Sequence, residues 1–148
     1  MDFSYERTIK ASVPTVWDAL IDPDAMTPHL PGTAKVVATG SDAYRVSMKI
    51  SMGFLRPTVN VDVQLSNLNE GNSFDISLAG KSMGAGVTGT AEVALGEHGS
   101  GTDSTRIKMT GTIHTSGLLK KIADSKIEDA ATGFLEAYFH SIERSVTS

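Results

Sequence analysis

The sequence predicts an α+β fold in which a strongly curved antiparallel sheet wraps around one long C-terminal helix. In the middle of the chain, apolar and polar residues alternate over several runs. This period of two is typical of strands with one buried and one solvated face. Near the C-terminus, apolar residues instead recur every three or four positions, as in an amphipathic helix. A sheet and a helix that each have one apolar face bury those faces against one another.

The N-terminal part predicts one strand and two short helices. Residues 3–11 alternate imperfectly and predict the first strand, and residues 13–20 predict a helix with Ser12 as its N-cap. The Asp-Pro pair that follows ends this helix, because the residue before a proline disfavours helical geometry. A second short helix is expected over residues 23–29, and the Pro-Gly pair at 31–32 predicts a turn after it.

The middle of the chain predicts a series of antiparallel strands, since a sheet with one solvated face is antiparallel by expectation. Segments rich in turn-forming residues separate the strands. The alternating runs cover residues 44–52, 59–65, 74–78, 87–95 and 107–113, and the turns are expected at 39–42, 67–72 and 96–104.

The last predicted element is a helix of roughly six or seven turns. Its apolar residues run from Leu119 to Ile142, and its charged residues lie mostly on the other side. The chain has 148 residues and a mass of 15.6 kDa, which is the size of one ordinary domain. We therefore expect a single domain over residues 1–148.

Composition excludes several classes of function. The 13 basic and 17 acidic side chains leave a net charge of −4, which is unfavourable for nucleic acid binding because phosphate contacts need clustered cations. The absence of cysteine excludes disulfides, thiolate metal sites and a cysteine nucleophile. The N-terminus has no signal-peptide pattern and no apolar run is long enough to span a bilayer. The expected location is the cytoplasm.

Motifs for catalysis or metal binding are weak. Residues 84–89 read Gly-Ala-Gly-Val-Thr-Gly, but a dinucleotide fingerprint needs a helix to begin there, and the following residues predict a strand. The simpler alternative is a bend in a curling strand. The four histidines have no metal-ligand spacing, and no nucleophile motif is present. We expect no catalytic residue, no metal and no cofactor.

Two features point to an interior ligand site, and each has a structural alternative. Met48, Met52 and Met109 share the inward phase of their strands with Gly89 and Gly111, which suits an adaptable apolar cavity but equally suits gap-filling in a core.

Arg7 lies in phase with Tyr5 and Ile9 on the first predicted strand. It is either a polar anchor that orients a ligand or an arginine at the rim whose stem packs while its head stays in water.

Several segments resemble the CoxG family, which is named for the G-type subunit of carbon monoxide dehydrogenase. The main one is Asp-Pro-Asp-Ala-Met at residues 22–26, followed by Leu-Pro-Gly at 30–32 and preceded by Val-Trp at 16–17. The resemblance covers nearly the whole chain. It implies a START-like (SRPBCC) helix-grip fold with the order β-α-α-β6-α, about seven strands, from a group of domains that bind lipids and other hydrophobic molecules.

The resemblance also implies a non-catalytic role beside a molybdenum-containing, carbon monoxide dehydrogenase-like hydroxylase, in its assembly or membrane recruitment, with a lipid or quinone-like ligand. Many members have a C-terminal extension that reaches the membrane. This chain stops at Ser148 with no apolar tail. We therefore expect at most peripheral contact with the inner face of the membrane.

The leading hypothesis is thus a protein that binds a hydrophobic small molecule. The ligand would enter between residues 22–32 and the N-terminal half of the last helix. The expected pocket residues are Leu30, Pro31, Met48, Ile50, Met52, Val61, Met109, Leu119 and Ala123, with Arg7 as the candidate polar anchor.

Two alternatives remain. One is an enzyme on the same scaffold, a cyclase, dehydratase or hydrolase, for which only Tyr5, Arg7 and Tyr44 lie on inward phases. None of these three is a good general base at neutral pH. The other is an adaptor with a filled core that acts only through its surface.

Overall fold

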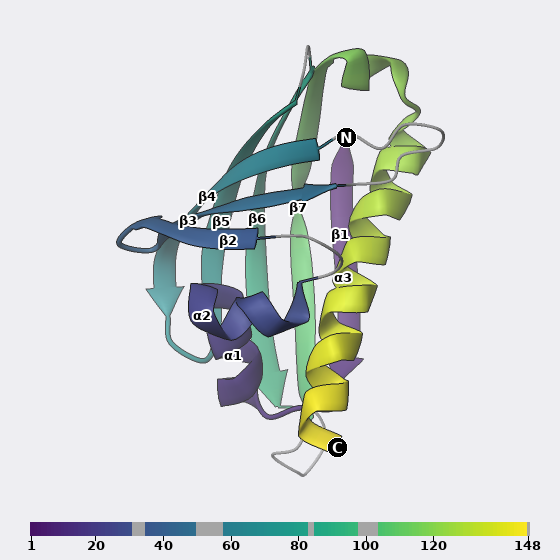
Figure 1. The fold of residues 1–148 in the computed structure, drawn as a ribbon. Helices are drawn as coiled ribbons and strands as arrows, with labels where there is room; N and C mark the ends of the chain where they lie inside the picture. Colours follow the sequence, from purple (N-terminus) through teal and green to yellow (C-terminus); the bar gives the residue numbers. More distant parts are fainter. Residues whose placement is uncertain (31–34, 50–57, 83–84, 98–103, 148) are drawn as a thin grey trace.

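The computed structural model describes residues 1–30, 35–49, 58–82, 85–97 and 104–147, and its elements confirm the predicted α+β class (Figure 1). The elements are β1 (Asp2–Ile9), α1 (Val13–Ile21), α2 (Pro23–Met26), the 3-10 helix η1 (Thr27–His29), β2 (Lys35–Gly40), β3 (Ala43–Lys49), β4 (Thr58–Asn69), β5 (Ser73–Ser82), β6 (Ala85–Glu97), β7 (Thr105–Gly117), the 3-10 helix η2 (Leu118–Lys121) and α3 (Asp124–Thr147).

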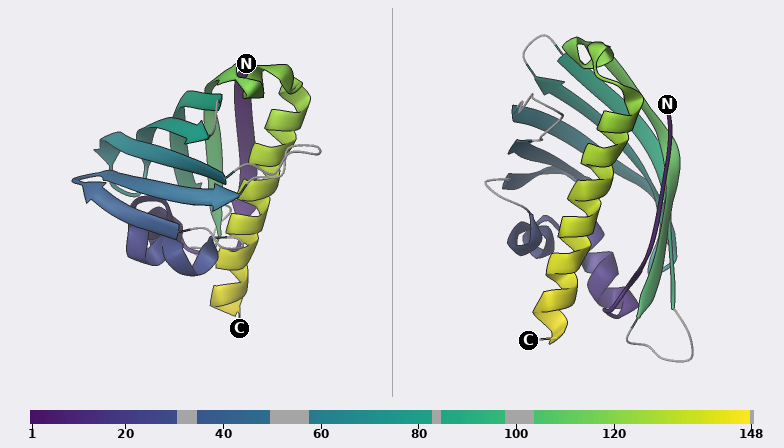
Figure 2. Two further views of the ribbon diagram at one scale, coloured as in Figure 1. Left: turned by 45° about the horizontal axis from the view of Figure 1, so that its top comes forward. Right: turned by 90° about the vertical axis from the view of Figure 1, so that its right-hand side faces the viewer.

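The seven strands form one antiparallel sheet in the order β1-β7-β6-β5-β4-β3-β2. Strands β2 to β7 follow one another as neighbours, and β1 pairs with β7 at the far edge. The sheet curves strongly, and α3 lies along its concave side close to β1 (Figure 2). The short helices α1 and α2 lie across one end of the same concave side (Figure 1).

The two short helices begin where the sequence predicts. Ser12 occupies the N-cap position of α1, but its hydroxyl bonds the Thr15 hydroxyl at 2.9 Å rather than a backbone amide. Asp22 caps α2, and its carboxylate accepts a hydrogen bond from the Asp24 amide at 3.0 Å. The predicted second helix is therefore α2 followed directly by η1.

The prediction of a helix that already begins at Leu119 is wrong. Leu119 lies in η2, and Ile122 is extended, with φ −92° and ψ 133°. The helix α3 begins only at Asp124. Apolar spacing reports which side chains are buried, and a short 3-10 turn buries Leu119 as well as an α-helix would.

Strand boundaries shift where the chain bends. The predicted turn at 39–42 narrows to Ser41 and Asp42, because β2 continues to Gly40 and Asp42 takes a left-handed φ of 55°. Strand β4 continues past Leu65 to Asn69, and its register with β5 shifts between Ser66 and Asn69. Such a bulge adds twist, which helps a sheet to curl.

The core lies between the concave face and the helices. Its fully buried members come from β1, α1, β6, β7 and α3: Ile9, Val16, Val93, Ile107, Phe139 and Ile142. The hydroxyl of the buried Thr105 donates to the carbonyl of Ala11 at 2.7 Å. This bond satisfies a buried polar group and joins β7 to the chain between β1 and α1.

We expect Gly111→Ala to lower the free energy of unfolding by about 2 kcal/mol, because the new methyl group would overlap the Thr90 carbonyl oxygen and the Ala91 backbone of β6. Gly96→Ala is the matched control, since no atom lies within 4 Å of its added methyl group. Urea unfolding measures both. Equal stability of the two variants would contradict the close approach of β6 and β7 at Gly111.

Candidate functional site

A cavity of about 330 Å³ lies between the concave face of the sheet and α3. This volume is at the lower end of the range for small-molecule sites. Strands, short helices and α3 all contribute to the wall. The lining includes Phe3, Leu20, Met26, Val46, Val59, Val63, Phe74, Ile76, Leu78, Val87, Val93, Ile113, Ile127, Ala130, Ala131, Phe134 and Leu135.

Strand alternation places the wall residues. On β4, Val59, Val61 and Val63 line the cavity, while the intervening Asn60 and Asp62 are exposed on the outer face. On β6 and β7, Gly89 and Gly111 line it without a side chain of their own. The small residues leave room that larger ones would fill, so the cavity follows from residue size along the inward phase.

Two tyrosine hydroxyls near the cavity are bonded to the backbone of α1. Tyr138 donates to the carbonyl of Ala19, and Tyr44 donates to the carbonyl of Leu20 at 3.4 Å. Burial raises the pKa of both phenols, so both are neutral at physiological pH. The protons of these hydroxyls are therefore committed to the protein's own carbonyl groups.

The predicted pocket residues divide into three groups. Leu30, Met48, Val61, Met109 and Leu119 line the cavity. Ala123 is exposed just before α3 and is not part of the wall. Pro31, Ile50 and Met52 lie outside the described residues. A ligand-binding role for any of them stays a prediction.

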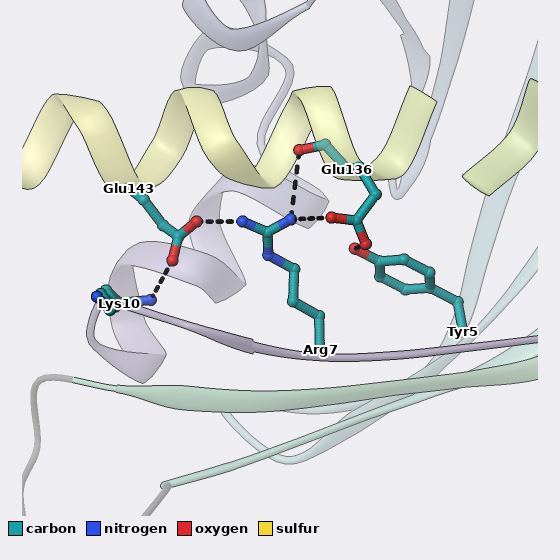
Figure 3. A network of polar contacts seen from close by, with 5 residues as sticks. All are labelled: Tyr5, Arg7, Lys10, Glu136 and Glu143. Carbon is teal, nitrogen blue, oxygen red and sulfur yellow. Dashed lines mark hydrogen bonds and ion pairs between the residues drawn. The ribbon is translucent and has the colours of Figure 1, made fainter. Parts of the chain in front are cut away.

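Arg7 contacts the protein itself rather than the cavity (Figure 3). Its guanidinium pairs with Glu136 and Glu143, two residues on one side of α3. The Tyr5 hydroxyl donates to Glu136 at 2.9 Å, and the Lys10 amide donates to Glu143 at 2.9 Å. We call these five residues the β1–α3 clamp.

The clamp shifts the protonation of its members. Burial and the Glu136 carboxylate raise the pKa of Tyr5 to about 12. Burial would raise the pKa of Glu143, but the Lys10 amide and the Arg7 guanidinium outweigh it and hold that pKa below its usual range. Both Glu143 and Arg7 are therefore charged at neutral pH, as an ion pair requires.

Sequence periodicity alone does not identify the α3 residues of the wall. Ile127, Ala130, Ala131, Phe134 and Tyr138 share one face of the helix through spacings of three and four residues. That spacing is visible in the sequence, but it reports only that a face is buried. Whether such a face packs solidly or borders a cavity depends on residues from distant strands.

A second, larger hollow of about 710 Å³ lies open on the outer face of the sheet. Its lining includes the exposed ion pair of Arg45 and Asp62, at 2.7 Å, and the exposed His114. This face is solvated and polar, as the outward phase of the strands predicts. The smaller apolar cavity is the candidate site, because enclosed apolar walls are typical of ligand sites.

Three further features concern the described residues only. They contain no cluster of three or more histidine, aspartate or glutamate side chains that could hold a metal ion. Of the glycine-rich string at 84–89, residues 85–89 belong to β6. Within the described part, none of the helices combines the length and the apolar character that crossing a bilayer requires.

Solved structures share this fold at low sequence identity. A conserved protein from Geobacillus kaustophilus has a TM-score of 0.85 and 14% identity, over 99% of this chain and 95% of that one. A START superfamily protein from Mycobacterium smegmatis has a TM-score of 0.69 and 14% identity, over 99% and 97%. The Zhui aromatase/cyclase from Streptomyces sp. R1128 has a TM-score of 0.62 and 12% identity, over 98% and 92%.

The curved sheet, the gripping helix and the cavity between them define a START-like helix-grip domain. Comparison with curated proteins finds no match. The model of the carbon monoxide dehydrogenase CoxG family, named for the G-type subunit of that enzyme, matches residues 6–147. The chain therefore belongs to the CoxG family, as its sequence resemblance predicts, and its class is that of a ligand-binding accessory protein.

Arg7→Met should lower the free energy of unfolding by about 2 kcal/mol, because it leaves Glu143, whose side chain is 14% exposed, without its counter-charge. The double variant Arg7→Met with Glu143→Gln should lose less, since no unpaired charge remains. Arg45→Met is the control at an exposed ion pair and should have little effect. A loss as large in Arg45→Met as in Arg7→Met would contradict a special role for the clamp.

His29 should make stability depend on pH in the weakly acidic range. Its Nδ1 bonds the Ser141 hydroxyl at 3.0 Å, and its ring edge faces Tyr138. Burial lowers the pKa of His29 below 6.5, so the folded state binds its proton less readily than the unfolded state. Stability from this group is therefore present above pH 6.5 and is lost as the pH falls.

Urea unfolding at pH 7 and pH 5 tests this dependence. His29→Gln keeps a hydrogen-bonding side chain but does not titrate. We expect the variant to lose less stability than the wild type over this interval. An equal loss in both proteins would assign the acid sensitivity to other groups.

Proposed function

We propose that this protein is a non-catalytic binding protein for an uncharged hydrophobic molecule of the lipid or quinone-like class. The cavity is the observation that carries the proposal. Its wall is built almost entirely from aliphatic and aromatic side chains. Burying roughly 200 Å² of apolar ligand surface there would stabilise a complex by about 5 kcal/mol before the cost of association.

The absence of charge in the described wall supports an uncharged ligand. No lysine, arginine, histidine or carboxylate is among the described residues that line the cavity. A carboxylate or sulfonate placed there would lose its hydration without gaining a counter-charge. The same wall offers no strong general base, since Tyr44 and Tyr138 are neutral phenols. This supports a carrier rather than an enzyme.

The partner in the proposal comes from the family. CoxG membership supports an accessory role for a molybdenum-containing, carbon monoxide dehydrogenase-like hydroxylase, in its assembly or its recruitment to the membrane. Co-elution of the purified chain with that hydroxylase from the same source, in size-exclusion chromatography, tests this part alone. Separate elution at concentrations of tens of micromolar, taken as roughly the upper limit for a functional contact, would refute it.

Two related dyes test the cavity. N-phenyl-1-naphthylamine is uncharged, and 1-anilinonaphthalene-8-sulfonate is the same aromatic skeleton with a sulfonate. We expect the uncharged dye to bind about tenfold or more tightly than the anionic one. Trp17, the single tryptophan, packs edge-on against Phe74 at 5.5 Å, and Phe74 lines the cavity. Its fluorescence is therefore a second reporter of binding.

Ala131→Phe should abolish or strongly weaken dye binding, because Ala131 lines the cavity from α3 and a benzyl side chain would occupy it. Ala137→Phe is the matched control, since Ala137 is exposed on the same helix. Urea unfolding of both variants checks that they fold. Unchanged dye affinity in a folded Ala131→Phe variant would refute binding in this cavity.

A further inference from the structure

The two halves of α3 are held to the domain in different ways. The side-chain hydrogen bonds and ion pairs that join α3 to the other described elements all involve residue 136 or a later one. They include the β1–α3 clamp, the bond from Tyr138 to α1 and the bond between Ser141 and His29. The C-terminal half is thus tied to β1, α1 and η1 together.

The apolar packing divides at the same place. Tyr138, Phe139 and Ile142 of the C-terminal half belong to the main core. Ile127 of the N-terminal half belongs to a separate cluster with Leu119 of η2, packed against strand residues such as Val87 and Ile113. Both clusters contribute to the cavity wall. The cavity therefore separates the strongly held half of α3 from the half held by its own small cluster.

A glycine stands at each end of this second unit. Gly133 is exposed in the middle of α3, and no atom lies within 4 Å of the position of an added methyl group. A glycine within a helix lowers its stiffness, because it adds backbone freedom and contributes no side-chain contact. Gly117 precedes η2 with φ 62°, a left-handed conformation that favours glycine.

From these observations we infer that residues 118–132 form a flap, hinged at Gly117 and Gly133, that opens the cavity to its ligand. The C-terminal half of α3 stays in place when the flap moves, because the clamp and the main core hold it. The function of the flap as an entrance rests on the proposed binding function. The motion of the flap does not, so the two can be tested separately.

Hydrogen exchange of the full chain tests the motion without any ligand. Amides 128–132 should exchange together, through an opening that precedes global unfolding, while amides 138–142 exchange only with global unfolding. Gly133→Ala should slow the exchange of amides 128–132 about fivefold, because alanine favours the helical form at an open position. Equal protection of both halves would overturn the flap. So would protection that rises steadily from residue 128, since that is fraying of a helix end.

A second variant separates the hinge from general helix propensity. Gly133→Ala combined with Ala137→Gly keeps the composition of the helix and moves the glycine one turn into the clamped half, at an exposed position. Exchange of amides 128–132 should remain slow in this variant. Recovery of the fast exchange would show that the position of the glycine does not matter, and would overturn the hinge at Gly133.

The association rate of N-phenyl-1-naphthylamine tests the entrance. Gly133→Ala should slow both association and dissociation of the dye about fivefold and leave its affinity unchanged, because the closed cavity is the same. Slowed exchange with unchanged dye rates would overturn the entrance. Failure of the dye to bind the wild type would refute the proposed binding function, and the entrance with it, while hydrogen exchange would still decide whether the flap exists.

Discussion

Burial of the C-terminal half of α3 is the interaction on which the rest of this structure depends. Phe139 and Ile142 have no exposed surface, and the hydroxyl of Tyr138 satisfies a carbonyl of α1. Arg7 adds two ion pairs from β1. A nearly straight helix fixed in this way cannot follow a strongly curved sheet along its whole length (Figure 2). Space therefore remains where the curve departs from the helix, and the small residues facing that space do not fill it.

The same arrangement determines which ligands the cavity favours. The charged groups of the β1–α3 clamp pair with one another beside the helix, so their charges are neutralised outside the cavity. The buried phenols of Tyr44 and Tyr138 donate to the end of α1. The protein thus satisfies its own interior polar groups, and what remains for a ligand is apolar surface and shape. Such a wall discriminates by charge and size more than by hydrogen-bond pattern.

The sequence predicts the fold well because local periodicity and the buried face are the same property in a sheet of this kind. Alternation identifies the inward residues of β4 and β7 correctly. It does not identify β2, whose Val36 and Val37 are adjacent and whose Val37 is 63% exposed at the sheet edge. The site is harder to predict. The partners of Arg7 lie 129 and 136 residues away in the chain, and no local pattern specifies that distance.

The interior methionines show the same limit. Met48 and Met109 could fill a core or border a cavity, and their inward phase is identical in both cases. What distinguishes the two cases is the size of the residues opposite, on α3. Ala130 and Ala131 lie there, and their short side chains leave the cavity open. Because short side chains also bury less surface, the half of α3 that borders the cavity gains less from packing than the clamped half. Cavity volume and weak local attachment therefore have one physical cause in this helix.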